Sequence, residues 1–133
     1  MDYSQSTYWI GGKTGLGFLE AIEKLKEALK TEGFGVLCDV DVQTLLKSKL
    51  GLDTSPYQIL GTCNPQLSHQ ALDFEHDLGV LLPCNFIVYQ KDEEIWIKAI
   101  DPVKMLSVVE NPALDPISAQ VKKKIEGVFS RIP

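Results

Sequence analysis

The chain has 133 residues, 44% of them hydrophobic and 23% charged, and its formal net charge is −5. This length suits one domain that can bury a hydrophobic core, so we predict a single domain over residues 1–133. The acidic balance argues against a general nucleic-acid-binding protein, which would present a basic face. No apolar run approaches the length of a membrane span, so we expect no membrane partner.

Three cysteines, Cys38, Cys63 and Cys84, lie in or beside predicted strands. Their odd number and the lack of a disulfide-dense pattern favour reduced thiols. The first residues contain neither the basic stretch nor the apolar stretch of a targeting segment. We therefore expect a cytoplasmic protein.

The first half of the chain predicts two strands and two helices. A strand over residues 7–10 is followed by a turn at Gly11 and Gly12, and an amphipathic helix then runs from Phe18 to Gly33. The second strand covers residues 34–40. A short helix follows from an N-cap at Asp41 to a stop at Gly51, and its inward side is expected to carry Val42, Leu45, Leu46 and Leu50.

The second half predicts three more strands and three helices. The third strand covers residues 57–62, and Asn64-Pro65 begins a helix that ends at Gly79. Two strands over residues 81–89 and 95–100 form an antiparallel hairpin with a polar turn. Asp101-Pro102 and Asp115-Pro116 begin the last two helices. The core stripe of the helix after Asn64 is expected to be Leu67, Ala71, Phe74 and Leu78.

The order β-α-β-α-β-α-β-β-α-α predicts an α/β (α+β) protein, a two-layer sandwich with a mixed sheet of about five strands. Helices are expected mainly on one face. The last strand is apolar on both sides, because Trp96 and Ile100 point one way while Ile95, Ile97 and Ala99 point the other. A sheet with one uncovered apolar face favours a second subunit, so we expect a homodimer.

The polar residues that best suggest a binding site lie where the third strand ends and the fourth begins. This stretch supplies Cys63, Asn64, His69, Cys84 and Asn85. Amides at a helix N-terminus stabilise a nearby thiolate and bind anions, so these five residues predict a site for a small ligand. Plain helix capping and burial of small thiols are the structural alternatives.

Two other functions stay open on the same residues. A thiol-based redox enzyme or sensor would use Cys63 as thiolate and His69 as proton carrier, which makes these two the candidate catalytic residues. A transition-metal-binding protein would use His69 with Asp73 and His76, or His69 with two thiols. Neither spacing matches a strong metal signature, so we assign no metal ligand and no cofactor.

The chain also carries a set of short motifs that resembles the domain of unknown function 302 family, over roughly residues 8 to 110. The resemblance implies a small two-layer α/β domain, usually dimeric, without an established activity. Ser68 stands where the family tends to have alanine. The motifs are Gly33-Phe34-Gly35-Val36-Leu37, Val40-Asp41-Val42, Leu46-Lys47-Ser48-Lys49-Leu50-Gly51, Pro56-Tyr57-Gln58-Ile59-Leu60-Gly61, Cys63-Asn64-Pro65, His69-Gln70-Ala71-Leu72, Leu81-Leu82-Pro83-Cys84-Asn85 and Asp101-Pro102.

Overall fold

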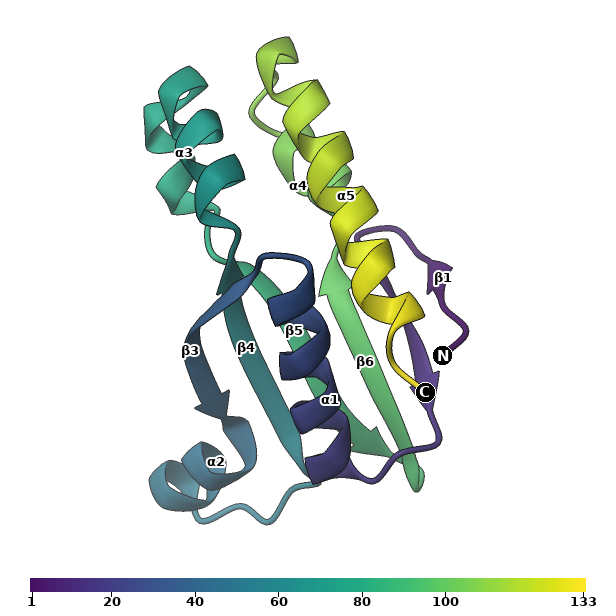
Figure 1. The fold of residues 1–133 in the computed structure, drawn as a ribbon. Coiled ribbons are helices and arrows are strands. Elements are labelled where there is room, and N and C mark those ends of the chain that lie inside the picture. Colours follow the sequence, from purple (N-terminus) through teal and green to yellow (C-terminus); the bar gives the residue numbers. More distant parts are fainter.

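The computed structural model describes residues 1–133, which form a six-stranded sheet with α1 and α5 packed on one face (Figure 1). The sheet order is β1-β2-β6-β5-β4-β3. None of the helices combines the length and apolar character needed to cross a bilayer. The strands are β1 (Ser4–Gln5), β2 (Trp9–Thr14), β3 (Gly35–Asp41), β4 (Tyr57–Cys63), β5 (Cys84–Lys91) and β6 (Glu94–Ile100). The helices are α1 (Phe18–Thr31), α2 (Val42–Leu50), α3 (Pro65–Phe74), α4 (Pro102–Ser107) and α5 (Asp115–Ser130), with short 3-10 helices η1 (His76–Val80) and η2 (Pro112–Leu114).

The two-layer α/β class is confirmed, whereas the sheet itself differs from the expected mixed sheet of about five strands. Every pair of neighbouring strands is antiparallel. The reason is that α2 and α3 do not carry the chain across a sheet face. Each leaves one end of the sheet, and the chain returns as the neighbouring strand. The sixth strand, β1, has two residues, too few for a periodic signal.

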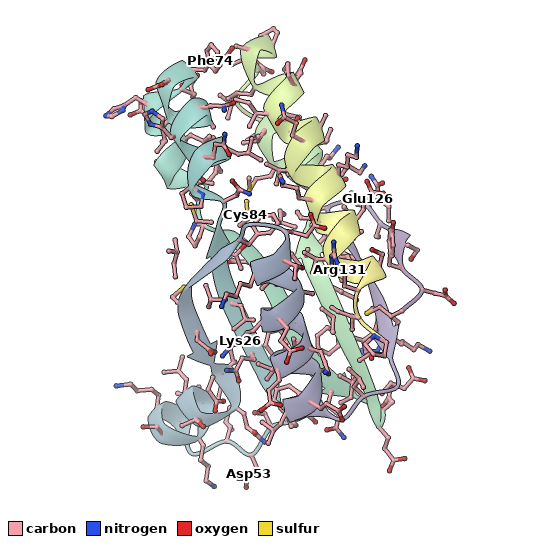
Figure 2. All side chains as sticks on the ribbon, viewed as in Figure 1. Lys26, Asp53, Phe74, Cys84, Glu126 and Arg131 are labelled. Atoms are coloured by element: carbon pink, nitrogen blue, oxygen red, sulfur yellow. The ribbon has the colours of Figure 1, made fainter.

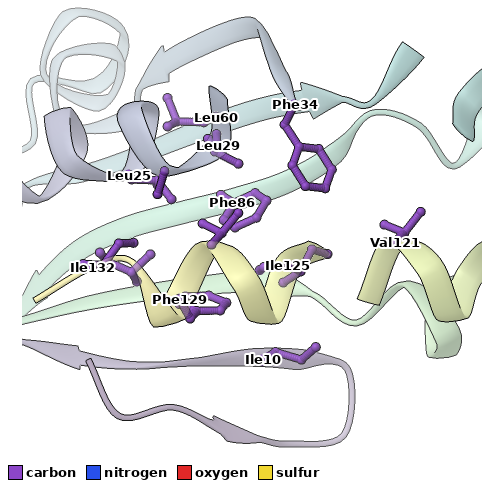
Figure 3. Packing of buried hydrophobic residues seen from close by; sticks show 14 of the residues in the cluster. Ile10, Leu25, Leu29, Phe34, Leu60, Phe86, Val121, Ile125, Phe129 and Ile132 are labelled. Atoms are coloured by element: carbon purple, nitrogen blue, oxygen red, sulfur yellow. The ribbon is translucent and has the colours of Figure 1, made fainter. Parts of the chain in front are cut away.

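The hydrophobic core lies between the sheet and the two helices α1 and α5 (Figure 3). Phe86 of β5 is fully buried at its centre. The Phe86 ring centroid lies 6.3 Å from that of Phe34, in an edge-on arrangement, and 6.1 Å from that of Phe129 in α5. Leu25 and Leu29 of α1 close the same cluster, and both are fully buried. This core fixes which face of each strand points away from the helices.

The predicted helix starts and stops are largely confirmed. The side chains of Asp41, Asn64 and Asp101 accept hydrogen bonds from backbone N–H groups of the following turn, at 3.0, 3.3 and 3.0 Å. Gly51 ends α2 with a left-handed φ of 67°. Asp115 is the exception: it lies inside α5 and caps nothing.

The predicted inward face of α2 is wrong, and that of the helix after Asn64 is right for Leu67, Ala71 and Leu78 but wrong for Phe74. None of the α2 residues is buried, and Leu45 and Leu50 are 46% and 65% exposed, because this helix lies at the end of the sheet (Figure 1). Helix α3 ends at Phe74 rather than at Gly79. The extended backbone of Glu75 turns the chain into η1, which leaves Phe74 exposed.

The expected turn at Gly11 and Gly12 is in fact the middle of β2. A β-carbon on Gly11 would lie 2.2 Å from the carbonyl oxygen of Ile97, and one on Gly12 would lie 2.3 Å from that of Asp2. Glycine therefore allows β6 and the segment before β1 to approach β2 closely.

Candidate functional site

The sheet face opposite α1 and α5 is lined by partly exposed apolar and aromatic side chains. We call it the open face and define it by Trp9, Tyr57, Ile59, Ile87, Tyr89, Trp96, Lys98 and Ile100, all of which are half-buried. Their strand neighbours, such as Phe86, Val88 and Ile97, point into the core. The aromatic rings form a row across the strands. Tyr57 and Tyr89 stack at 5.5 Å between ring centroids, and Tyr89 and Trp96 stack at 6.4 Å.

A cavity of about 760 Å³ lies against the open face. Its walls are strand residues, the α2 residues Val42 and Leu46, and the loop before β4 at residues 54–56. Nine of its 16 lining residues are hydrophobic, and the aromatic members include Tyr8, Tyr57 and Tyr89. This volume lies within the range of pockets that bind small organic molecules.

Lys98 of β6 occupies an unusual position beside this cavity. Its Nζ lies 4.0 Å from the ring centroid of Trp9, 4.7 Å from that of Trp96 and 5.2 Å from that of Tyr89. Such contacts attract the ammonium to the negative faces of the rings. Lys98 is also one of the residues that line the cavity.

The Tyr57 phenol in the cavity keeps its proton at neutral pH. Burial, together with the neighbouring phenols of Tyr89 and Tyr8, raises the pKa of Tyr57 above its ordinary value. The Tyr57 side chain therefore contributes flat apolar surface and a hydroxyl group but no negative charge.

The two thiols of the predicted site have different environments. The Cys63 side chain is half-buried, and its Sγ lies 2.9 Å from Oγ of Ser68 in α3. Cys84 is buried near the junction between the sheet and the α3 end of the molecule, where it lines a small apolar cavity of about 30 Å³ (Figure 2). Burial, with a smaller contribution from Cys63, raises the pKa of the Cys84 thiol to about 11. The Cys84 thiol is thus protonated at neutral pH and is a poor nucleophile.

The other three predicted residues lie in three different places. Asn64 is almost fully buried, and besides capping α3 its amide nitrogen donates to the carbonyl of Glu32 at 3.4 Å. The His69 side chain is 80% exposed, and its Nε2 lies 3.8 Å from the Asp73 carboxylate. Asn85 is exposed on β5 and lines the large cavity. The large cavity therefore includes one of the five predicted residues.

The geometry does not favour the metal site considered from the sequence. No three His, Cys, Asp or Glu side chains come together as a metal-binding group. His69 lies on α3 whereas His76 lies in η1, after the change of direction at Glu75. The seven-residue spacing therefore does not place the two imidazoles on one helix face.

The antiparallel sheet with two helices on one face and an aromatic cavity on the other defines a two-layer α/β domain. Comparison with known proteins names its family. The model of "Domain of unknown function DUF302" matches residues 12–132, so the chain belongs to the DUF302 family, as its motifs predicted.

The fold has a close counterpart among solved structures. The crystal structure of an uncharacterized conserved protein DUF302 from Bacillus stearothermophilus superimposes with a TM-score of 0.90 at 34% sequence identity. The match covers 96% of this chain and 100% of that one. No curated protein matches the sequence.

Sequence reasoning missed Trp9, Tyr57 and Lys98 as site residues. They come from β2, β4 and β6, and strand register alone brings them to one face. The one signal in the sequence that pointed to this face was the 95–100 strand, whose side chains are apolar on both sides of the sheet.

Proposed function

We propose that the protein is a homodimeric domain that binds a small organic ligand in the cavity of the open face. The observation that carries this proposal is the cavity itself, which combines about 760 Å³ with a mainly hydrophobic lining and a few polar groups. The Leu-Pro-Cys-Asn motif contributes Asn85 to this lining. Cys84, which precedes Asn85 in β5, would then support this strand end through its burial, whereas Cys63, Asn64 and His69 lie outside the cavity.

The proposed second subunit covers the part of the open face that lies outside the cavity. Val40 and Ile59 pair across β3 and β4 on this face, and Ile59 pairs in turn with Ile87. Val40 is 37% exposed, and neither Val40 nor Ile59 lines the cavity. Burying this apolar row between two copies would remove it from water and leave the cavities at the interface.

We expect Ile59→Glu to convert a dimer into a monomer, because two carboxylates would be buried at the interface. Light scattering after size-exclusion chromatography would report the mass, which is 14.8 kDa for one chain. Val80→Glu is the matched control, since Val80 is 87% exposed in η1, away from the sheet, and should leave the dimer intact. A wild-type protein that stays monomeric at every concentration would refute the dimer.

Ligand binding is tested separately with a fragment library and saturation-transfer NMR. Leu46→Trp, which fills the cavity from α2, is expected to abolish the binding of most fragments. Leu45→Trp on the same helix is the control, because Leu45 is exposed and does not line the cavity. Hits that survive Leu46→Trp unchanged would place ligand binding elsewhere.

The thiol-based alternative has weaker support. The hydrogen-bond partner of Cys63 is Ser68, and the acidic partner of His69 is Asp73, so no thiol–imidazole pair is formed. Cys84 is held in its protonated form by burial.

A further inference from the structure

The charges that line the large cavity are all positive. Lys91 and Lys98 are its only lining residues with a charged side chain, and the 16 include no Asp or Glu. The whole chain, by contrast, has 18 acidic residues against 13 Lys and Arg. An acidic protein with a positive cavity attracts anions to that cavity in preference to the rest of its surface.

Lys98 provides a cation that has no acidic partner in the protein. Its ammonium makes none of the seven ion pairs and none of the side-chain hydrogen bonds of the structure. The rings of Trp9, Trp96 and Tyr89 hold it in place through their faces. Ring faces position an ammonium without neutralising it, so its N–H groups stay available to an anion.

Lys13 shows what a neutralised lysine on the same face looks like. Its Nζ also approaches the Trp96 ring, at 5.2 Å, but it forms an ion pair with Glu94 at 2.9 Å. Lys13 does not line the cavity. The two lysines therefore share the Trp96 ring as a neighbour, but only the ammonium of Lys98 has no carboxylate beside it.

The surface around Lys98 fits a flat apolar group. The Tyr57 and Tyr89 rings are inclined by only 11° to each other, and both line the cavity with Ile87 and Ile100. Stacking on such rings and contact with the aliphatic side chains favour a planar body. Asn85 and Gln90 supply the uncharged polar groups that orient a ligand.

From this arrangement we infer that the cavity selects a small organic anion, a carboxylate or phosphate carried on a flat apolar body, with Lys98 as the charge anchor. This inference rests on the proposed ligand-binding function and names the chemical class of the ligand. The ammonium accepts the negative group of the ligand, and the tyrosine rings contact its flat body. An ordinary apolar cavity would prefer the neutral form, since removing a charge from water without a partner costs free energy.

Three probes of similar shape and different charge distinguish an anion-selective cavity from an ordinary apolar one. They are 2-naphthoate, neutral 2-naphthamide and cationic 2-naphthylmethylammonium, each titrated into the full-length protein by calorimetry. We expect naphthoate to bind at least about tenfold more tightly than the amide, as one charge-assisted hydrogen bond predicts. The ammonium is expected to bind weakest. Raising the salt concentration from roughly 0.05 to 0.5 M should weaken naphthoate binding and leave amide binding unchanged.

Lys98→Met tests the anchor, with Lys13→Met as the matched control. We expect Lys98→Met to weaken naphthoate binding about tenfold and amide binding much less, so that the preference for naphthoate is lost; an unchanged circular dichroism spectrum would show that the variant is folded. Lys13→Met should bind naphthoate like the wild type. Trp9 and Trp96 are the only tryptophans and both contact Lys98, so quenching of their fluorescence by naphthoate would locate the ligand on the open face.

The outcomes distinguish the proposed ligand binding in the cavity from the inferred selection of an anion. If all three probes bind equally, or if Lys98→Met keeps full naphthoate affinity, the cavity binds ligands but the inference of an anion is wrong. If no probe binds at all, both the inference and the proposed ligand-binding function fail. Tighter binding of the ammonium would show that the rings recognise cations and would overturn the inference.

Discussion

Phe86→Ala is expected to lower the free energy of unfolding by about 3–5 kcal/mol, the largest change that we expect from a single residue. Phe86 is fully buried, and its ring packs against Phe34, which immediately precedes β3, and against Phe129 of α5. Removing the ring leaves a cavity between the sheet and both covering helices. Urea unfolding, followed by circular dichroism at one fixed protein concentration, would measure the change.

Leu19→Ala is the control for this experiment. Leu19 lies on α1 but is 75% exposed, so its truncation is expected to change stability by less than about 0.5 kcal/mol. Equal effects of the two substitutions would contradict the position of the core between the sheet and the helices.

Gly11→Ala is expected to lower the free energy of unfolding by about 1–3 kcal/mol and to move Lys98 away from its rings. The added β-carbon would lie 2.2 Å from the carbonyl oxygen of Ile97 and 2.8 Å from Cγ of Lys98. Strands β2 and β6 would have to separate, and Trp9 would move with β2. Urea unfolding would report the stability, and the emission wavelength of the tryptophans would report the change around Lys98.

Gly15→Ala is the control that distinguishes the clash of a β-carbon at position 11 with β6 from the general effect of replacing a glycine. No atom lies within 4 Å of a β-carbon at Gly15. Removing backbone freedom from the unfolded chain should therefore leave this variant as stable as the wild type or slightly more stable. If Gly11→Ala matched Gly15→Ala, the close approach of β6 to β2 would be refuted.

Local signals in the sequence predicted the helix boundaries well, because they depend on neighbouring residues. A polar side chain before a proline identifies the caps at Asn64 and Asp101. The break of α3 at Glu75 had no such signal, since apolar residues keep the helical spacing through Leu78 although the backbone does not. Likewise, the leucines of α2 repeat with helical spacing, although none of them is buried.

The sheet order was not predictable from the same patterns. Each strand followed by a helix suggests a parallel crossover, and nothing local distinguishes this from a helix placed at the end of an antiparallel pair. The two-sided apolar pattern of β6 did indicate an uncovered face. The position of Trp9 next to Lys98 requires knowing that β2 pairs with β6, which is long-range information.

The candidate site shows the same contrast between local sequence signals and long-range strand pairing. Motif reasoning selected polar residues that are close in sequence around Cys63 and Cys84, and the structure uses Asn64 there for capping. The large cavity draws instead on residues from four strands and α2. Of the predicted set it contains Asn85, whose alternation along β5 places it on the open face.

The pairing of β2 with β6 also determines how the protein can fold during synthesis. Trp9 of β2 pairs with Ile100 of β6, so β2 is made long before its inner neighbour exists. Until β6 leaves the ribosome, β2 and α1 have no completed sheet on which to bury Ile10, Leu25 and Leu29. Contacts this distant in sequence slow folding, since the intervening chain must be ordered first. The nascent chain therefore carries β2 without its inner neighbour, and an amphipathic helix with nothing to cover its apolar face, through most of its translation, when assistance from chaperones would matter most.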